Sequence, residues 1–398
     1  MRILIINTFY YPKFVGGAEL SVQYLAEALV ADGNKVFVIC LGERQRVYRH
    51  NGVLIIQFKE KNIYSIYTKK SANALVKIIW HLIDSFNLFH YHILGKLIDK
   101  INPDIINTNN IQGISPVIWK LIKARQIKLV HTIRDYYLLC HKSILFKNGH
   151  TCDNLCTDCR ATYQLKKPFF KYPDHFIGIS DFVIAKHKQY GTIKSASSMV
   201  FNAVETNVAQ NPSQLTGISG KVTWGYIGRF TADKGFDYLI DELTNLNDVT
   251  SAKIEILFAG KGEMDTVQKS GTTLLASNIK HSFLGVVKPG DFFSKIDALI
   301  IPSLWFEPFG RVVIEALSYG VPVCMSDRGG LKELYSESCC WLFTPTTGSL
   351  KRKIEMISND ALSIAEKGSL AVEYAAKFSI KKNLTETLRV YDKVLSIN

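Results

Sequence analysis

Short apolar runs alternate with helix-like patterns along the whole chain. Residues 1–8 and 296–303 are short and mostly apolar, as expected for parallel strands that are buried on both faces. Each run is followed, after a loop, by apolar residues at helical spacing: Leu20, Tyr24, Leu25, Ala28 and Leu29 in the first case, and Val312, Val313, Ala316 and Leu317 in the second. Strands that alternate with helices predict an α/β fold with parallel sheets.

The same alternation predicts two domains and a C-terminal helix. A chain of 398 residues is too long for one typical core. We expect a first domain over residues 1–205, closed by a strand at 196–204, and a polar linker near 205–221. The second domain covers 206–378, with strands at 224–227, 253–259, 281–285, 298–302 and 321–326. The segment 379–398 contains the last predicted helix, at 382–397.

Composition is that of an ordinary globular protein, with 47% hydrophobic and 21% charged residues. Residue 1 opens a strand without the basic and apolar regions of a secretory signal. No apolar run reaches the roughly 18 residues that a membrane-spanning helix needs. We therefore expect a cytoplasmic protein.

Positive charge is concentrated in the first half. Residues 1–200 hold 27 Lys and Arg against 13 Asp and Glu, a net charge of +14, whereas the remainder holds 21 against 22. This balance favours an anionic membrane surface, at the inner face of the membrane, or a polyanionic acceptor. Nucleic acid is not expected, because the basic residues form no recognisable binding module.

One basic stretch has two interpretations. It contains Lys69, Lys70 and Lys77 together with apolar residues, namely Leu75, Ile78, Ile79, Trp80, Leu82 and Ile83. It could lie at a membrane interface, or it could be a core helix whose lysines point to water.

Two glutamates mark the clearest candidate site. Glu307 falls in the loop after the strand at 296–303, and Glu315 falls about one turn inside the next helix. Backbone N–H groups at a helix start attract phosphate, and carboxylates accept hydrogen bonds from sugar or ribose hydroxyls. Together these groups suit a nucleotide sugar. The alternative is a pair of ordinary acids, one near the helix N-terminus and one in solvent.

Glycine-rich turns follow three other predicted strands. Arg229 and Lys234 lie on the turn that begins at Gly228, where two cations could neutralise a diphosphate without a metal. Gly260 follows another strand, and Gly16 with Gly17 precedes the first helix, where backbone can approach a phosphate closely. Solvated loop cations and simple tight turns are the alternatives.

Four of the eight cysteines lie within residues 140–159: Cys140, Cys152, Cys156 and Cys159. In a reducing compartment, close thiols more often bind a metal than form disulfides. The spacing favours a structural zinc site in an insertion at 140–160. Free thiols in a loop are the alternative.

These motifs together resemble the retaining glycosyltransferases of family 4. The resemblance covers nearly the whole chain and rests, in chain order, on Gly16, Gly17, Glu19, Pro103, Asp104, Thr108, His131, Ser180, Asn202, Gly228, Arg229, Lys234, Gly235, Glu307 and Glu315. It implies a GT-B fold, in which two Rossmann-like domains face a central cleft. The donor would bind mainly to the C-terminal domain and the acceptor mainly to the N-terminal domain.

The resemblance also implies residue roles. It makes His131, Arg229, Lys234 and Glu307 catalytic, with His131 beside the transferred sugar. It makes the following residues donor-binding: Gly16, Gly17, Gly228, Gly260, Val287, Phe309, Gly310, Arg311 and Glu315. The expected reaction is retaining transfer from a uridine or guanosine diphosphate sugar to a glycan or lipid-linked acceptor in cell-surface polysaccharide synthesis. Catalysis would need no metal or other cofactor.

Departures from the family pattern are few. Ala203 and Glu205 stand where the family more often has Gly and Asp, which we expect to alter only the hinge, and the double glycine before Glu333 is kept. A nucleotide-sugar epimerase of the same fold and a non-catalytic binding subunit remain alternatives. A phosphorylase would need a pyridoxal lysine that we do not identify, and a dinucleotide oxidoreductase would need Gly-x-Gly-x-x-Gly after the first strand.

Overall fold

The chain divides into two compact units, each built around a sheet of mainly parallel strands. The structure is a computed structural model that describes residues 1–66, 73–205, 221–262, 275 and 279–397. Unit 1 comprises Met1–Leu145, Cys152–Ala203 and Ile380–Asn398, and unit 2 comprises Phe146–Thr151 and Val204–Ser379. No helix in these described ranges is long and apolar enough to cross a membrane.

Unit 1 contains an eight-stranded sheet in the order β10-β9-β6-β5-β1-β2-β4-β3. All neighbours pair in parallel except β3 and β4. The strands are β1 (Arg2–Ile6), β2 (Lys35–Gly42), β3 (Arg46–His50), β4 (Val53–Lys59), β5 (Ile105–Thr108), β6 (Lys128–Ile133), β9 (His175–Gly178) and β10 (Ala196–Met199). The helices are α1 (Gly17–Ala31), α2 (Ala74–Ser85), α3 (Tyr91–Ile101), α4 (Val117–Lys123), α5 (Thr157–Lys166), α6 (Asp181–Gln189) and α14 (Ile380–Leu395).

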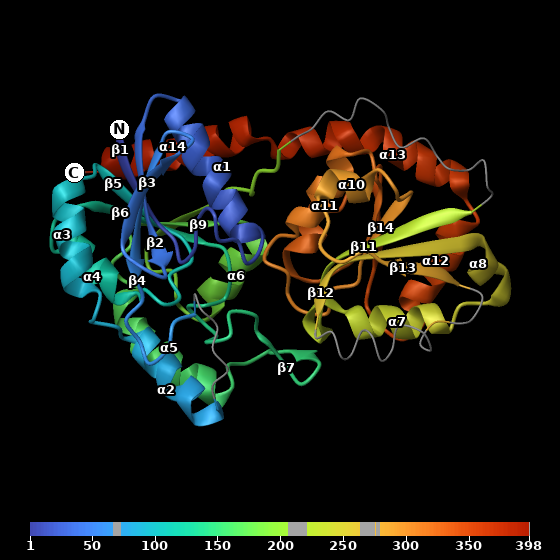
Figure 1. Cartoon of the computed structure of the whole chain (residues 1–398), viewed down its shortest axis with the longest axis horizontal. Helices are drawn as coiled ribbons and strands as arrows, with labels where there is room; N and C mark the ends of the chain where they lie inside the picture. The colour runs from blue at the N-terminus through green and yellow to red at the C-terminus, as the bar shows by residue number, and fades with distance from the viewer. Residues whose placement is uncertain (67–72, 206–220, 263–274, 276–278, 398) are drawn as a thin grey trace. The chain divides into compact units, whose positions relative to one another are not determined.

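The C-terminal helix α14 belongs to unit 1. It packs against α1 and β6, and Figure 1 shows this red helix among the blue elements of the N-terminal half. Val390, Tyr391 and Val394 join the buried cluster that contains Ile3 and Val22. The amide of Asn107 donates a hydrogen bond of 2.6 Å to the Tyr391 hydroxyl. An apolar stripe with one satisfied polar group therefore fixes the end of the chain on the first sheet.

Unit 2 contains a six-stranded parallel sheet in the order β13-β12-β11-β14-β15-β16. The strands are β11 (Val222–Phe230), β12 (Ile254–Gly262), β13 (Lys280–Phe283), β14 (Ala298–Ile301), β15 (Val323–Ser326) and β16 (Cys340–Phe343). The helices are α7 (Phe236–Thr244), α8 (Asp248–Lys253), α10 (Pro289–Phe293), α11 (Arg311–Ser318), α12 (Ser349–Ser358) and α13 (Ala361–Ala375). A two-stranded hairpin, β7 (Phe146–Lys147) with β8 (His150–Thr151), lies inside the predicted insertion.

Strand bounds differ from the sequence expectation at several places. The strand expected at 196–204 ends at Met199. Beyond it the Val200 N–H still donates to the carbonyl of Gly178, and the carbonyl of Phe201 accepts from the amide of Asn383. The edge strand β16 was not predicted, since four residues after a polar run give little periodic signal. Most of the predicted linker, residues 206–220, lies outside the described residues.

Candidate functional site

Two loops of unit 2 meet at the carboxyl edge of its sheet. β11 and β14 are parallel neighbours, so the segments that follow them emerge at the same edge. Lys234 ends a short 3-10 turn after β11, and its Nζ lies 2.5 Å from Oε1 of Glu307, in the loop after β14. The Ser303 hydroxyl donates to the same Oε1 at 2.9 Å. The fold therefore brings together an amine and a carboxylate that lie far apart in sequence.

Two glycines allow these loops to approach closely. Gly235 has φ +71°, and a Cβ there would lie 1.9 Å from the carbonyl oxygen of Pro302. Gly329 has φ +63°, and a Cβ there would lie 2.4 Å from the carbonyl oxygen of Glu307. The next residue, Gly330, donates its backbone N–H to that carbonyl at 2.7 Å. Any side chain at either glycine would push the Lys234 or Glu307 loop away.

Arg229 lies at the end of β11 and is held by Asp233. Its Nη2 donates to Oδ2 of Asp233 at 2.6 Å, and the Arg229 side chain is 54% exposed whereas Asp233 is buried. Asp233 also accepts backbone N–H groups of Leu304 and Trp305 at its carbonyl oxygen. One guanidinium edge is thus oriented by the protein, while much of the group faces solvent.

The helix α11 begins beside Glu307. Gly310, in the left-handed region with φ 103°, is its N-cap, and Phe309 just before it is buried against Phe378. Arg311 Nε donates to Oε1 of Glu315 at 2.6 Å. Glu315 therefore lies one turn into the helix, as expected, and forms an ion pair with Arg311 of the same helix. The first turn of a helix presents N–H groups to an anion.

The remaining donor-binding candidates of unit 2 lie along the same edge. Gly228 and Gly260 are register partners on β11 and β12. The backbone N–H of Gly260 donates to the carbonyl of Gly285 at 2.7 Å, and half-buried Val287 follows in the loop before α10. Gly228 and Gly260 lie inside β11 and β12, near their ends, so the strands extend into the segments that the sequence analysis expected to be turns.

His131 lies within β6 of unit 1 and is only 3% exposed. Its Nδ1 lies 2.9 Å from the Thr108 hydroxyl, and its ring contacts Trp119 at a centroid distance of 4.8 Å. Burial, followed by the neighbouring His187, lowers the pKa of His131 to about 3. His131 is thus enclosed by its neighbours in unit 1, and its expected position beside a transferred sugar stays a prediction.

The residue at the carboxyl end of β6 is Arg134, which the sequence analysis did not select. Its Nε donates to Oδ1 of Asn109 at 2.7 Å, and its Nη1 donates to Oδ1 of Asn202. All three side chains are buried. The sequence feature that could have identified Arg134 is its position, because it is the first residue after an apolar strand.

Gly16 and Gly17 open α1 in unit 1. Gly16 is the N-cap, Gly17 is the first helical residue, and both are exposed. The Gly16 N–H donates to Oε2 of Glu19 at 2.9 Å. Burial raises the pKa of Glu19 above its ordinary value. The glycines therefore stand at a helix start, where the sequence analysis placed them.

The cysteine segment brings together only part of the predicted zinc set. Cys140 and Cys159 have their sulfur atoms 3.4 Å apart, and the Cys159 sulfur lies 3.4 Å from Nδ1 of His141. The hydrogen bond from Cys159 lowers the pKa of Cys140 to about 5. Cys152 and Cys156 are half-buried. Within the described ranges, no three His, Cys, Asp or Glu side chains are arranged to hold a metal ion.

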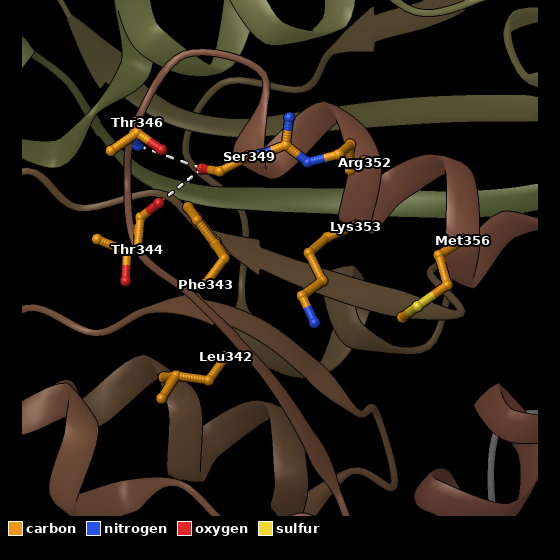
Figure 2. Close-up of a pocket in the computed structure, with 8 residues that line it drawn as sticks. All are labelled: Leu342, Phe343, Thr344, Thr346, Ser349, Arg352, Lys353 and Met356. Atoms are coloured by element: carbon orange, nitrogen blue, oxygen red, sulfur yellow. Dashed lines mark hydrogen bonds between the residues drawn. The ribbon is translucent and has the colours of Figure 1, made fainter.

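A surface pocket of about 470 Å³ lies elsewhere in unit 2. Figure 2 shows its lining residues, which come from β16, the following loop and α12, with Ser349 bonded to Thr344 and Thr346. None of the predicted site residues lines it. The strand-edge arrangement around Glu307, and not this pocket, is therefore the candidate site of unit 2.

Two family models match consecutive parts of the chain. "Glycosyltransferase Family 4" matches residues 15–208, and "Glycosyl transferases group 1" matches residues 210–391. A 42.6 kDa protein in the cps region of Klebsiella pneumoniae is 38% identical over 338 residues, which are 84% of this chain and 87% of that protein. A glycosyltransferase of Methanocaldococcus jannaschii is 26% identical over 390 residues, 90% of each chain.

Solved structures share the fold over the full length. Anabaena HepE in complex with UDP superposes with a TM-score of 0.73 at 19% identity, over 99% of this chain and 100% of that one. Sucrose-phosphate synthase of Thermosynechococcus elongatus superposes with a TM-score of 0.75 at 18% identity, over 100% and 99% of the two chains. At these identities the likeness concerns the fold.

Proposed function

This chain belongs to the family 4 glycosyltransferases, with a GT-B fold of two Rossmann-like domains, and from that premise we propose that it transfers a sugar from a uridine diphosphate sugar to a glycan or lipid-linked acceptor, with retention of anomeric configuration. The choice of uridine is supported by HepE, whose structures contain UDP or UDP-glucose. The choice of pathway is supported by the Klebsiella relative from a cps region.

The observation that carries this proposal is the meeting of Lys234, Glu307 and half-exposed Arg229 at one strand edge beside the start of α11. A diphosphate needs positive charge and N–H donors, and a sugar needs acceptors for its hydroxyls. Cations, helix N–H groups and carboxylates all occur within this one loop system. A non-catalytic protein has no chemical need for all of them.

In the proposed reaction, the bond from the sugar C1 to the diphosphate oxygen breaks while a bond from C1 to the acceptor oxygen forms on the same face. The acceptor proton passes to the departing phosphate oxygen. Arg229 and Lys234 stabilise the charge that grows on the diphosphate. Preorganised cations of this kind make a large contribution to stabilising a transition state. Glu315 binds the ribose diol, and Glu307 with the Phe309 and Gly310 amides binds the donor sugar.

We place the protein at the inner face of the membrane, because residues 1–200 carry a net charge of +14 (27 basic against 13 acidic residues) and a lipid-linked acceptor would lie there. The donor would be soluble and the acceptor membrane-bound. No metal is assigned to the transfer step, since two cations and a helix start supply positive charge at the diphosphate.

A donor screen tests the proposal. Purified protein is incubated with UDP- and GDP-sugars, and hydrolysis or transfer is followed by release of the nucleotide. We expect turnover with at least one UDP-sugar, and an axial C1 substituent in donor and product by NMR when the donor is α-linked. Turnover only with guanosine donors would overturn the base assignment, and inversion at C1 would overturn the retaining mechanism.

A further inference from the structure

The helix α2 presents an apolar face to solvent. Leu75, Ile78, Ile79 and Leu82 lie at helical spacing on one side, and they are 66%, 51%, 40% and 38% exposed. The exposed side chains of Phe86, Leu88 and Phe89 continue directly from the end of the helix. We call these seven residues the α2 apolar face. Large contiguous apolar surface of this kind usually marks an interaction site.

The opposite side of α2 anchors the helix to unit 1. Trp80 is 1% exposed and its indole N–H donates to the carbonyl of Tyr64 at 2.8 Å. Asp84 is equally buried and accepts the backbone N–H of Gly113 at 2.6 Å. The helix also packs on α5. The core-facing side is therefore already satisfied, and the α2 apolar face is additional to it. Lys69 and Lys70 of the same basic stretch lie outside the described residues.

Exposed basic side chains lie on α2 and on the neighbouring α5 segment. Lys77 is exposed on α2 itself, and Arg160, Lys167 and Lys171 are exposed on α5 and the segment that follows it, against the exposed acid Asp158. Phe86 contacts the buried Phe169 of that segment at a ring distance of 5.8 Å, so the end of α2 packs against the segment that carries Lys167 and Lys171. Residues 1–200 as a whole carry 27 basic against 13 acidic side chains.

We propose that the α2 apolar face docks unit 1 onto an anionic lipid bilayer, with α2 lying parallel to the surface. Aliphatic and phenylalanine side chains would enter the boundary between headgroups and acyl chains, while the nearby Lys and Arg pair with anionic headgroups. Twelve helical residues span only about 18 Å, which is too short to cross the hydrocarbon core but long enough to lie in the interface. This docking concerns an interaction surface and does not depend on the transfer reaction proposed above.

The α2 apolar face and the basic side chains near it together favour a bilayer over a protein partner. A lipid surface offers hydrocarbon below a layer of negative charge, so it complements both features at once. A second copy of this chain would bring a second set of basic side chains against the first, which is unfavourable at low salt. Self-association therefore remains an outcome of the test and not the proposal.

The experiment measures sedimentation of the full chain with vesicles. Vesicles of phosphatidylcholine alone are compared with vesicles containing 30% phosphatidylglycerol, at 50 mM and 500 mM salt. We expect at least tenfold tighter binding to the anionic vesicles, and partial release at high salt because exposed charges are screened. The double variant Ile78→Ser/Leu82→Ser should bind at least tenfold more weakly than the wild type, and Lys77→Glu should weaken binding to anionic vesicles only.

Leu362→Ser is the matched control, because Leu362 on α13 of unit 2 is 78% exposed and apolar but lies outside this face. It should bind vesicles like the wild type. All variants change exposed side chains, so circular dichroism and UDP binding should stay unchanged, which separates failed docking from a failed donor site. Equal wild-type binding to neutral and anionic vesicles, or unchanged binding of the double variant, would overturn the proposal. A dimer that the double variant converts to monomer, without vesicle binding, would instead make this face a self-association surface.

Discussion

Nζ of Lys234 and Oε1 of Glu307 lie 2.5 Å apart, although the two residues are separated by 73 positions in the chain. The contact exists because β11 and β14 are parallel neighbours whose following loops leave the same edge of the sheet. It places a cation and an anion at the edge where we propose that the donor diphosphate and its sugar bind.

Lys234→Ala should lower turnover on the true donor by about 10²- to 10³-fold, because it removes one preorganised positive charge. It should also destabilise unit 2 by roughly 1–3 kcal/mol, since buried Glu307 loses a charged partner. The measurements are steady-state kinetics and urea unfolding. Lys280→Ala is the control, as it breaks an exposed ion pair with Glu255 and should cost below about 1 kcal/mol. Equal effects of the two variants would contradict the assignment.

Arg229→Ala should reduce transfer by about 10²- to 10³-fold, whereas Arg229→Lys should recover part of the loss. Asp233→Asn should act through Arg229, because Asp233 orients one of its nitrogens. We therefore expect Asp233→Asn to raise KM for the donor and to have little further effect when Arg229 is already alanine. Near wild-type turnover of Arg229→Ala would show that the diphosphate binds elsewhere.

Transfer should persist in excess chelator. The expected reason is that Arg229, Lys234 and the α11 start supply the positive charge at the diphosphate. Initial rates are measured in EDTA immediately after mixing, so that slow loss of any structural metal does not interfere. Complete loss of activity that only magnesium or manganese restores would refute metal independence.

His131 should contribute to the dependence of stability on pH. Its pKa of about 3 in the folded state lies below the ordinary value of 6.5. Between these values the unfolded chain binds the proton and the folded chain does not, so stability falls as pH drops through this window, by at most about 1.4 kcal/mol per unit. His131→Gln should therefore lose less stability than the wild type between pH 7 and pH 5 in urea unfolding. Identical losses would mean that His131 does not titrate in this way.

The zinc prediction for the insertion also remains open to measurement. Cys140 and Cys159 are already close, but Cys152 and Cys156 would have to approach them, because the described residues contain no ready group of three metal-binding side chains. Metal analysis of the purified protein should give about one zinc per chain, lost in Cys140→Ser/Cys159→Ser and kept in Cys40→Ala. Zinc-free protein with native circular dichroism would show that the thiols are simply free.

The sequence by itself determined those local elements whose apolar pattern is clear. Periods of two and 3.6 residues depend only on neighbours in the chain, so β1, β11, β14, α1 and α11 could be predicted within a few residues. The family followed from motifs in chain order. The strand β16 and the early end of β10 could not be predicted in this way, because four residues carry too little periodicity.

Only the tertiary structure decided which residues meet and which faces are covered. Lys234 and Glu307 form an ion pair because of the strand order, and not because of their spacing in the sequence. His131 is buried within β6, whereas Arg134 follows the last residue of that strand. The apolar pattern of α2 fitted a core helix and a membrane helix equally well. The structure shows that Trp80 and Asp84 occupy the inner side and that Leu75 and Ile78 lie outside. A pattern records that a helix has two sides, but the rest of the fold decides which side is buried.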